Sequence, residues 1–177
     1  TYEIVLGGPM MGSLGNRFDV VKKTTNAILV LPPDHYIVKK KQAKQSIDIK
    51  RAMAACCQCT YCTDLCPRHL LGHPIDPAHF MLNASHTMEK TPYLDAAFCS
   101  GCGLCEMYSC GQGLSPRSLL DAQKAENRKN GLKPEPQKGS GVPDARRYRR
   151  VPMKRLAARI GVDKYNKTAP MLDDEIN

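Results

Sequence analysis

The sequence predicts an α+β chain in which a short β segment precedes a mostly helical domain. Three observations predict it: β-prone apolar runs end by residue 31, all nine cysteines lie between residues 56 and 110, and prolines mark helix starts from residue 76 onward. The chain has 177 residues, enough for one or two domains. Its 42% hydrophobic content includes the cysteines, and the chain has three Phe and no Trp. Because this leaves few residues for an apolar core, we expect the fold to be stabilised by something in addition to that core.

The N-terminal segment contains three short runs that favour β-strands. They cover residues 2–6, 20–21 and 27–31, and Gly or Pro pairs end the first and the last. The glycines at positions 7, 8, 12 and 15 do not form a G-x-G-x-x-G motif, and no Walker A lysine follows them. We therefore interpret these glycines as tight turns, with a phosphate-binding loop as the less favoured alternative.

Four dipeptides place proline where a helix can begin, because the missing N–H of proline is unpaired in a first turn anyway. They are Asp76-Pro77, Thr91-Pro92, Ser115-Pro116 and Val151-Pro152, the first three with a capping residue before the proline. Gly131 and Gly161 are placed to end the third and fourth helices. A further helix is expected to be capped by Ser46 and to run into the first cysteines.

One set of apolar residues follows helical spacing after Asp76. Phe80, Met81, Ala84 and Met88 recur at intervals that place them on one helix face. We interpret them as core residues and not as part of a cofactor site.

The cysteines form two runs of similar spacing. The first run is Cys56-x2-Cys59-x2-Cys62-x3-Cys66, followed by Pro67, and the second is Cys99-x2-Cys102-x2-Cys105-x4-Cys110. The first matches the bacterial pattern for [4Fe–4S] binding. Three thiolates two residues apart can reach three iron corners from one short loop, and the fourth corner needs a ligand from elsewhere. The sequence therefore predicts two [4Fe–4S] clusters.

The ligand sets are expected to cross between the runs, because the fourth Cys of each run in two-cluster ferredoxins ligates the other cluster. The first cluster is expected to use Cys56, Cys59, Cys62 and Cys110, and the second Cys99, Cys102, Cys105 and Cys66. Such crossed ligation would hold the two halves together and offset the thin apolar core.

Several alternatives remain open at this point. Zinc usually binds separated Cys pairs, not overlapping triplets, and disulfides would leave one Cys over. The second run has an extra residue, and Gly111 stands where Pro is expected, so a [3Fe–4S] cluster is conceivable there. Cys57 is expected to be a buried or semi-buried free thiol, with a ligand swap or a redox switch as the alternative. His69 and His73 are ordinary histidines or lie close behind the first cluster.

Residues 55–68 and 110–117 resemble the cobalamin reductases of propanediol-utilisation microcompartments, a family related to the C subunit of the Rnf electron-transport complex. Residues 5–12 resemble the end of the β-grasp (SLBB) domain of these proteins, and residues 150–156 resemble the segment after the clusters. The resemblance covers residues 5 to 172, and the cysteines carry most of its specificity.

The resemblance implies three parts. Residues 1–45 would end a β-grasp domain, residues 46–129 would form a dicluster ferredoxin-like domain of the alpha-helical type, and residues 130–177 would be a basic linker and helix leading to a domain absent here. It implies an NADH-dependent oxidoreductase in which FMN and NADH bind the missing part. The present residues would relay electrons through two clusters toward cobalamin. A cobalamin-dependent enzyme or adenosyltransferase would be a partner, in the cytoplasm and inside a microcompartment.

The charge is uneven along the chain. The formal charge is +9, and residues 117–177 hold 15 basic and 8 acidic side chains. Eight thiolates and two oxidised cores would lower the total to about +5. We interpret the basic tail as a solvated face, with docking to an acidic partner as the alternative. Because no nucleic-acid fold signature appears, we expect no nucleic-acid binding.

The sequence indicates neither a membrane-spanning protein nor a secreted one. No run approaches the 18–20 apolar residues of a membrane span, and the start lacks both a signal peptide and an initiator Met, so we expect an excised fragment. The alternatives to a cobalamin reductase are an Rnf-like part of a membrane-associated ion-translocating complex and a structural or regulatory iron–sulfur protein.

Overall fold

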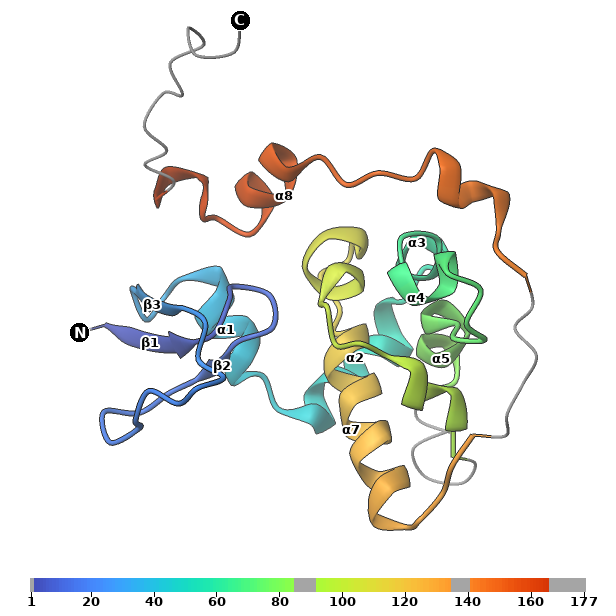
Figure 1. Ribbon diagram of the computed structural model, residues 1–177, viewed down its shortest axis with the longest axis horizontal. Helices are drawn as coiled ribbons and strands as arrows, with labels where there is room; N and C mark the ends of the chain where they lie inside the picture. Colours follow the sequence, from blue (N-terminus) through green and yellow to red (C-terminus); the bar gives the residue numbers. More distant parts are fainter. Residues whose placement is uncertain (1, 85–91, 135–140, 166–177) are drawn as a thin grey trace, which may run out of the picture.

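The computed structural model describes residues 2–84, 92–134 and 141–165. Its N-terminal part is an antiparallel three-stranded sheet in the order β2-β1-β3, formed by Glu3–Leu6 (β1), Ser13–Leu14 (β2) and Ile28–Leu31 (β3) (Figure 1). The predicted strands at 2–6 and 27–31 are thereby confirmed.

The strand predicted at residues 20–21 is wrong. Val20 and Val21 are 67% and 69% exposed and lie in the excursion between β2 and β3. The missing strand is β2, in which Leu14 pairs with Val5 of the central strand. The β propensity of two valines does not form a strand without a partner strand beside them.

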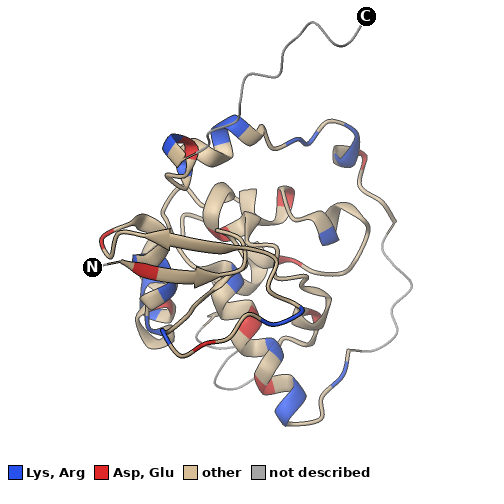
Figure 2. Ribbon diagram, turned by 60° about the vertical axis from the view of Figure 1, so that its left-hand side comes forward, with Lys and Arg blue, Asp and Glu red and all other residues tan. Residues whose placement is uncertain are grey.

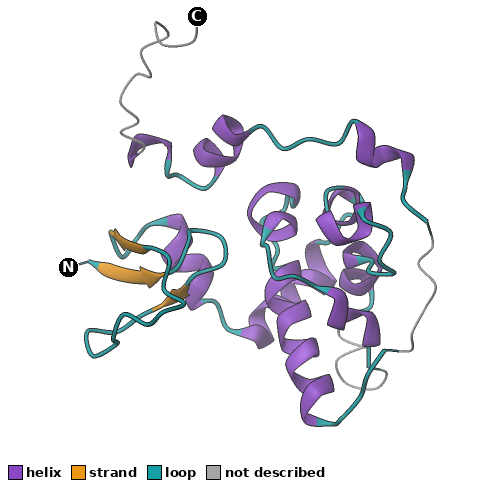
Figure 3. Cartoon of the chain, in the orientation of Figure 1, coloured by secondary structure: helices purple, strands orange, loops and turns teal. Residues whose placement is uncertain are grey.

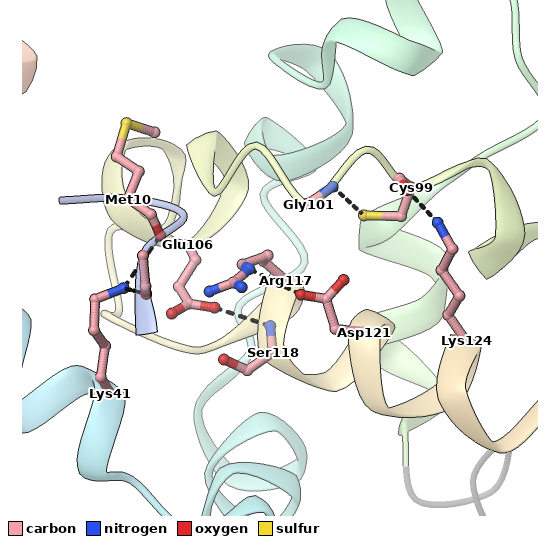
Figure 4. A network of polar contacts seen from close by, with 10 residues as sticks. Met10, Lys41, Cys99, Gly101, Glu106, Arg117, Ser118, Asp121 and Lys124 are labelled. Carbon is pink, nitrogen blue, oxygen red and sulfur yellow. Dashed lines mark hydrogen bonds and ion pairs between the residues drawn. The ribbon is translucent and has the colours of Figure 1, made fainter. Parts of the chain in front are cut away.

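A tight turn joins β1 to β2, as the glycine pattern predicts. The Gly12 amide donates to the Gly8 carbonyl at 2.8 Å, and a Cβ at Gly12 would lie only 2.6 Å from that oxygen. Lys41 Nζ donates to the carbonyls of Met10 and Gly12 and holds the turn in place (Figure 4). Burial, helped by nearby Arg117, lowers the pKa of Lys41 to about 8.

Helix α1 (Tyr36–Gln42) covers the sheet, although the sequence patterns do not predict it. Its Ile37 and Val38 pack with Val5 and Leu31 into a small core. Nδ1 of His35 accepts the Ile37 amide at 3.2 Å and so caps the helix.

The helical part follows the sheet and contains the larger core (Figures 1 and 3). Its elements are α2 (Gln45–Ala55), α3 (Tyr61–Asp64), α4 (Pro67–Leu70), α5 (Pro77–Leu82), the 3₁₀ helix η1 (Leu94–Phe98), the π-helix η2 (Cys105–Ser109) and α7 (Pro116–Lys129). Phe80, Met81 and Ala84 are buried in this core, as predicted, together with Leu119 and Leu120. Met88 lies outside the described residues.

Two of the predicted proline-marked helix starts are confirmed. Helix α5 begins at Pro77, with the Asp76 carboxylate accepting the His79 amide at 3.0 Å, and α7 begins at Pro116. Gly131 follows the end of α7 with φ of 67°, the left-handed conformation expected of a C-terminal glycine.

The other three predicted starts need correction. The helix α2 begins at Gln45 with Lys44 as its cap, so Ser46 lies inside the first turn. After Pro92 the chain forms the 3₁₀ helix η1, which begins only at Leu94, and Thr91 lies outside the described residues. Helix α8 (Met153–Arg159) begins one residue after Pro152, which is itself the cap. Gly161 follows α8 with φ of 72°, as predicted.

The C-terminal segment returns across the molecule and contacts both parts (Figure 1). It carries η3 (Asp144–Arg147), α8 and η4 (Asp163–Tyr165). Leu156 and Ile160 of α8 pack on Met107 of η2, and the Gly161 carbonyl lies 3.0 Å from Nε2 of His35. Residues 135–140 of the predicted linker lie outside the described residues. No helix within the described part is long and apolar enough to cross a bilayer.

Candidate metal centre

The cysteines gather around two cavities in the helical part. The first thiol cavity is lined by five of them, Cys56, Cys57, Cys59, Cys62 and Cys110. The second thiol cavity is lined by the other four, Cys66, Cys99, Cys102 and Cys105. Each cavity therefore receives three cysteines at x2 spacing from one run and the last cysteine of the other run.

The two loops that carry the triplets share one backbone conformation. Residues on both sides of each middle cysteine are left-handed: Gln58 (φ 55°) and Thr60 (φ 60°) in the first loop, Gly101 (φ 67°) and Gly103 (φ 79°) in the second. Left-handed residues turn the chain sharply, so each loop curls its thiols around the cavity. The second loop uses glycine for these turns, whereas the first uses residues that resist them.

The extra residue of the second run is taken up inside a helix. Between Cys62 and Cys66 the chain forms the α-helix α3, and between Cys105 and Cys110 it forms the π-helix η2. Each hydrogen bond of a π-helix spans one residue more, i to i+5, than that of an α-helix. The two closing cysteines consequently have similar backbone angles, with φ and ψ of −68° and 118° at Cys66 and −75° and 108° at Cys110.

Backbone amides donate hydrogen bonds to the thiols. The Gly101 amide donates to Sγ of Cys99 at 3.3 Å, and the Leu114 amide donates to Sγ of Cys110 at 3.3 Å (Figure 4 shows the first). The amides of Arg68 and His69 do the same for Cys66 at the start of α4. These bonds favour the thiolate form of each cysteine.

Burial acts against the thiolate form. It raises the pKa of Cys62 to about 12, with nearby Cys110 adding to the rise, and it raises the pKa of Cys105 well above its ordinary value. Buried thiols that face one another need a compensating positive charge before they can ionise together. Iron bound between them would supply that charge.

The donor set fits a thiolate-bound metal group. Each cavity offers at least four cysteine sulfurs, and neither has a His, Asp or Glu among its lining residues. Soft sulfur ligands of this kind select iron–sulfur clusters or zinc. Within the described ranges, no three His, Cys, Asp or Glu side chains close around a single point as they would around one metal ion.

Neither His69 nor His73 is among the described residues that line the two cavities. Nδ1 of His69 lies 3.1 Å from the Ile75 carbonyl, and His73 stacks on Phe98 with 5.6 Å between ring centroids. Their side chains therefore act locally, and of the two histidines only His69 contacts a cysteine sulfur, through its amide. Cys57 is exposed, so the prediction of a buried or semi-buried thiol is wrong, although the residue also lines the first cavity.

Comparison with known proteins gives a family for the cysteine region. Residues 55–115 match the family described as the 4Fe-4S dicluster domain. We refer to this matching segment as the dicluster domain. The match includes every cysteine of both thiol cavities.

Longer similarities extend beyond the dicluster domain. The chain is 36% identical over 176 residues to the cobalamin reductase PduS of Salmonella typhimurium, which covers 96% of this chain and 38% of that protein. It is 34% identical to PduS of Citrobacter freundii with the same coverage. It is also 33% identical over 102 residues to the C subunit of the ion-translocating oxidoreductase complex of Buchnera aphidicola, covering 56% of this chain and 19% of that protein.

These similarities support an iron–sulfur electron-transfer role. The chain spans about two fifths of the length of the cobalamin reductases it matches. No solved structure gives a significant match.

Two basic residues beside the dicluster domain's cysteines are not indicated by the sequence patterns. Lys124 Nζ donates to the Cys99 carbonyl at 2.7 Å, and Arg159 donates to the Cys110 carbonyl at 2.7 Å (Figure 4 shows the first). They lie 25 and 49 residues from the cysteines they contact, so no local pattern indicates them. Both add positive charge next to sites that would carry four thiolates.

Proposed function

We propose that the chain is an electron relay that holds two [4Fe–4S] clusters. The first would be ligated by Cys56, Cys59, Cys62 and Cys110, and the second by Cys66, Cys99, Cys102 and Cys105. The observation that carries the proposal is the lining of the thiol cavities, in which each triplet faces the closing cysteine of the other run. Crossed sets of this kind are typical of two-cluster ferredoxins.

The protein's own groups would adjust each site for electron transfer. A bound [4Fe–4S] cluster supplies reversible one-electron chemistry. The Gly101 and Leu114 amides donate toward sulfur, and Lys124 and Arg159 bring positive charge to the carbonyls beside Cys99 and Cys110. Both influences stabilise added negative charge and raise the reduction potential. Met81 and Leu114 line the first cavity, and their apolar side chains would help to exclude water from a bound cluster.

The longer protein's activity is part of the proposal. Similarity to cobalamin reductases supports a whole protein that passes electrons from NADH through FMN and the clusters to cobalamin, inside a microcompartment. Residues 1–45 would end a β-grasp (SLBB) domain, residues 46–129 would form a relay of the alpha-helical ferredoxin type, and residues 130–177 would lead to a further domain. A cobalamin-dependent enzyme or adenosyltransferase would receive the product.

A second candidate is membership of an ion-translocating electron-transport complex. The 33% identity to the C subunit of the Buchnera aphidicola complex favours it, although it covers only 56% of the chain. Co-purification of the full-length protein with membrane subunits would distinguish this role from that of a cobalamin reductase.

Iron analysis tests the relay directly. Chain purified without oxygen is expected to contain about eight irons and to give EPR signals of two interacting clusters on reduction. An iron content near four per chain would mean that only one of the two sites holds a cluster. Zinc in place of iron would overturn the proposal. Clusters that cannot be reversibly reduced would instead favour a structural role.

Paired substitutions test the crossed ligand sets. Cys66→Ala combined with Cys99→Ala is expected to remove about four irons, because both side chains serve one cluster. Cys110→Ala combined with Cys99→Ala is expected to remove about eight, because the two side chains serve different clusters. The opposite result would mean that each run closes its own cluster. Cys57→Ala is the matched control and should keep all the iron.

A further inference from the structure

A large cavity lies between the C-terminal segment and the dicluster domain, outside both thiol cavities. Its volume is about 420 Å³. Four arginines of the C-terminal segment line it, Arg149, Arg150, Arg155 and Arg159. Figure 2 shows Lys and Arg along this segment. We call this cavity the arginine groove.

The positive charge of the arginine groove is mostly unbalanced. Among the residues that the structure describes, no Asp or Glu lines it, and only Arg149 forms an ion pair there, with Asp64 at 3.0 Å. Arg150 donates to the carbonyls of Arg146 and Arg149, and Arg159 donates to that of Cys110. Three of the four guanidinium groups that line the groove therefore have no carboxylate partner among the described residues, and a multiply charged anion would stabilise them.

Three tyrosines also line the groove. They are Tyr61, Tyr108 and Tyr148, and Tyr61 and Tyr148 are 54% and 69% exposed as whole residues. Arginine also lies over two of these rings, 5.9 Å from the centroid of Tyr108 and 6.0 Å from that of Tyr148. Exposed aromatic faces beside guanidinium groups provide stacking surfaces for a flat ring.

We propose that the arginine groove binds a phosphate monoester of a planar heteroaromatic molecule, the chemistry of a nucleotide. Planar guanidinium forks match phosphate oxygens, and the tyrosines match the ring. The volume of the groove lies in the range of small-molecule sites, about 300–1,000 Å³. This favours a small ligand over an acidic protein partner, which could dock on a flat basic surface. Tyr61 and Ser109 line the groove and each directly precedes a cysteine of the first thiol cavity, so the ligand would lie beside that cavity.

Calorimetric titration of the iron-loaded chain with adenosine 5′-monophosphate tests the proposal. Adenosine and inorganic phosphate are the control ligands. Each is expected to bind at least about tenfold more weakly than the monophosphate, because adenosine lacks the phosphate group and inorganic phosphate lacks the ring. Arg150→Gln combined with Arg155→Gln is expected to weaken binding of the monophosphate at least about tenfold. Both side chains are exposed, so the thermal midpoint should be unchanged.

The control variant removes two charges from the same segment outside the groove. Arg147→Gln combined with Lys154→Gln is expected to change the affinity by less than about twofold, because salt screens the attraction between the ligand and charges outside the groove. Equal weakening by both double variants would reduce the effect to net charge and overturn the proposal. Adenosine binding as tightly as its monophosphate, or a polyglutamate peptide binding more tightly, would overturn it as well. The binding measurement is independent of cluster reduction, so its failure leaves the electron relay untouched.

Discussion

At the scale of single residues, the most unusual feature is the left-handed backbone of Gln58 and Thr60. Both flank Cys59, and neither is a glycine. For a β-branched residue such as Thr60 this conformation is a strained outlier. The equivalent positions beside Cys102 are Gly101 and Gly103, which adopt it without strain. The first loop therefore stores strain at the place where it presents three thiols.

Replacing Thr60 by glycine should relieve that strain. Thr60→Gly is expected to raise the free energy of unfolding by about 1 kcal/mol, because glycine adopts the left-handed conformation freely. Thermal unfolding of the iron-loaded protein under anaerobic conditions measures the change. Thr60→Ala is the control and should give little gain, since alanine keeps the Cβ that causes the clash. Equal stabilisation by both variants would refute the strain argument.

At the scale of elements, the start of α5 joins a helix cap to the cysteine region. Burial alone would raise the pKa of Asp76, but hydrogen bonds from the His79 amide, the Thr63 hydroxyl and the Ala78 amide together lower it. The hydroxyl of Thr63 donates to Oδ1 of Asp76 at 2.5 Å and accepts the Ala78 amide at 2.8 Å. Thr63 directly follows Cys62, so this cap fixes α3 against α5.

Removing the cap should therefore destabilise the domain. Asp76→Ala is expected to lower the free energy of unfolding by about 1–2 kcal/mol, and Asp76→Asn by less, because the amide oxygen still accepts a hydrogen bond. Since folding lowers the pKa of Asp76, the wild type's advantage over Asp76→Asn is complete above about pH 4 and declines as the pH falls further.

Chemical denaturation across this pH range measures both effects. Asp144→Ala, at an exposed acidic position in η3, is the control and should leave stability unchanged. An advantage of wild type over Asp76→Asn that grows toward acid pH would contradict the assignment.

Sequence patterns predict the elements that carry strong local signals and miss those that depend on contacts. The Asp76-Pro77 and Ser115-Pro116 pairs mark helix starts correctly because cap and proline act locally. Helices α3 and α4 have four residues each, too few to show a helical period. In the sequence the π-helix η2 shows only as an irregular spacing before Cys110. The arginine groove joins residues 61 to 159 and could not be predicted without the fold.

At the scale of the whole molecule, the C-terminal segment is held by a small apolar contact. Leu156 and Ile160 are 5% and 3% exposed and pack on Met107, which lies between Cys105 and Cys110. Polar contacts add to it: the Arg149–Asp64 pair, the hydrogen bond of Arg159 to the Cys110 carbonyl and the contact of His35 with the Gly161 carbonyl. The arginine groove consequently depends on this contact for its shape.

Truncating that contact should release the segment. Leu156→Ala is expected to cost about 2–4 kcal/mol of docking free energy and to speed tryptic cleavage at Arg155 and Arg159. Met153→Ala, at a residue 72% exposed on the same helix, is the control and should be cleaved at the wild-type rate. Unchanged cleavage of Leu156→Ala would mean that α8 is held by its charged contacts alone.

The lining of the thiol cavities has a consequence for inheritance and engineering. The two cysteine loops share their left-handed turns and the backbone angles of their closing cysteines, so they resemble two copies of one motif. Each cavity nevertheless takes its fourth cysteine from the other copy. A cut anywhere between residues 66 and 99 would leave each piece with an open-sided cavity. The halves cannot be inherited, shuffled or transplanted singly, so the smallest exchangeable module is the pair.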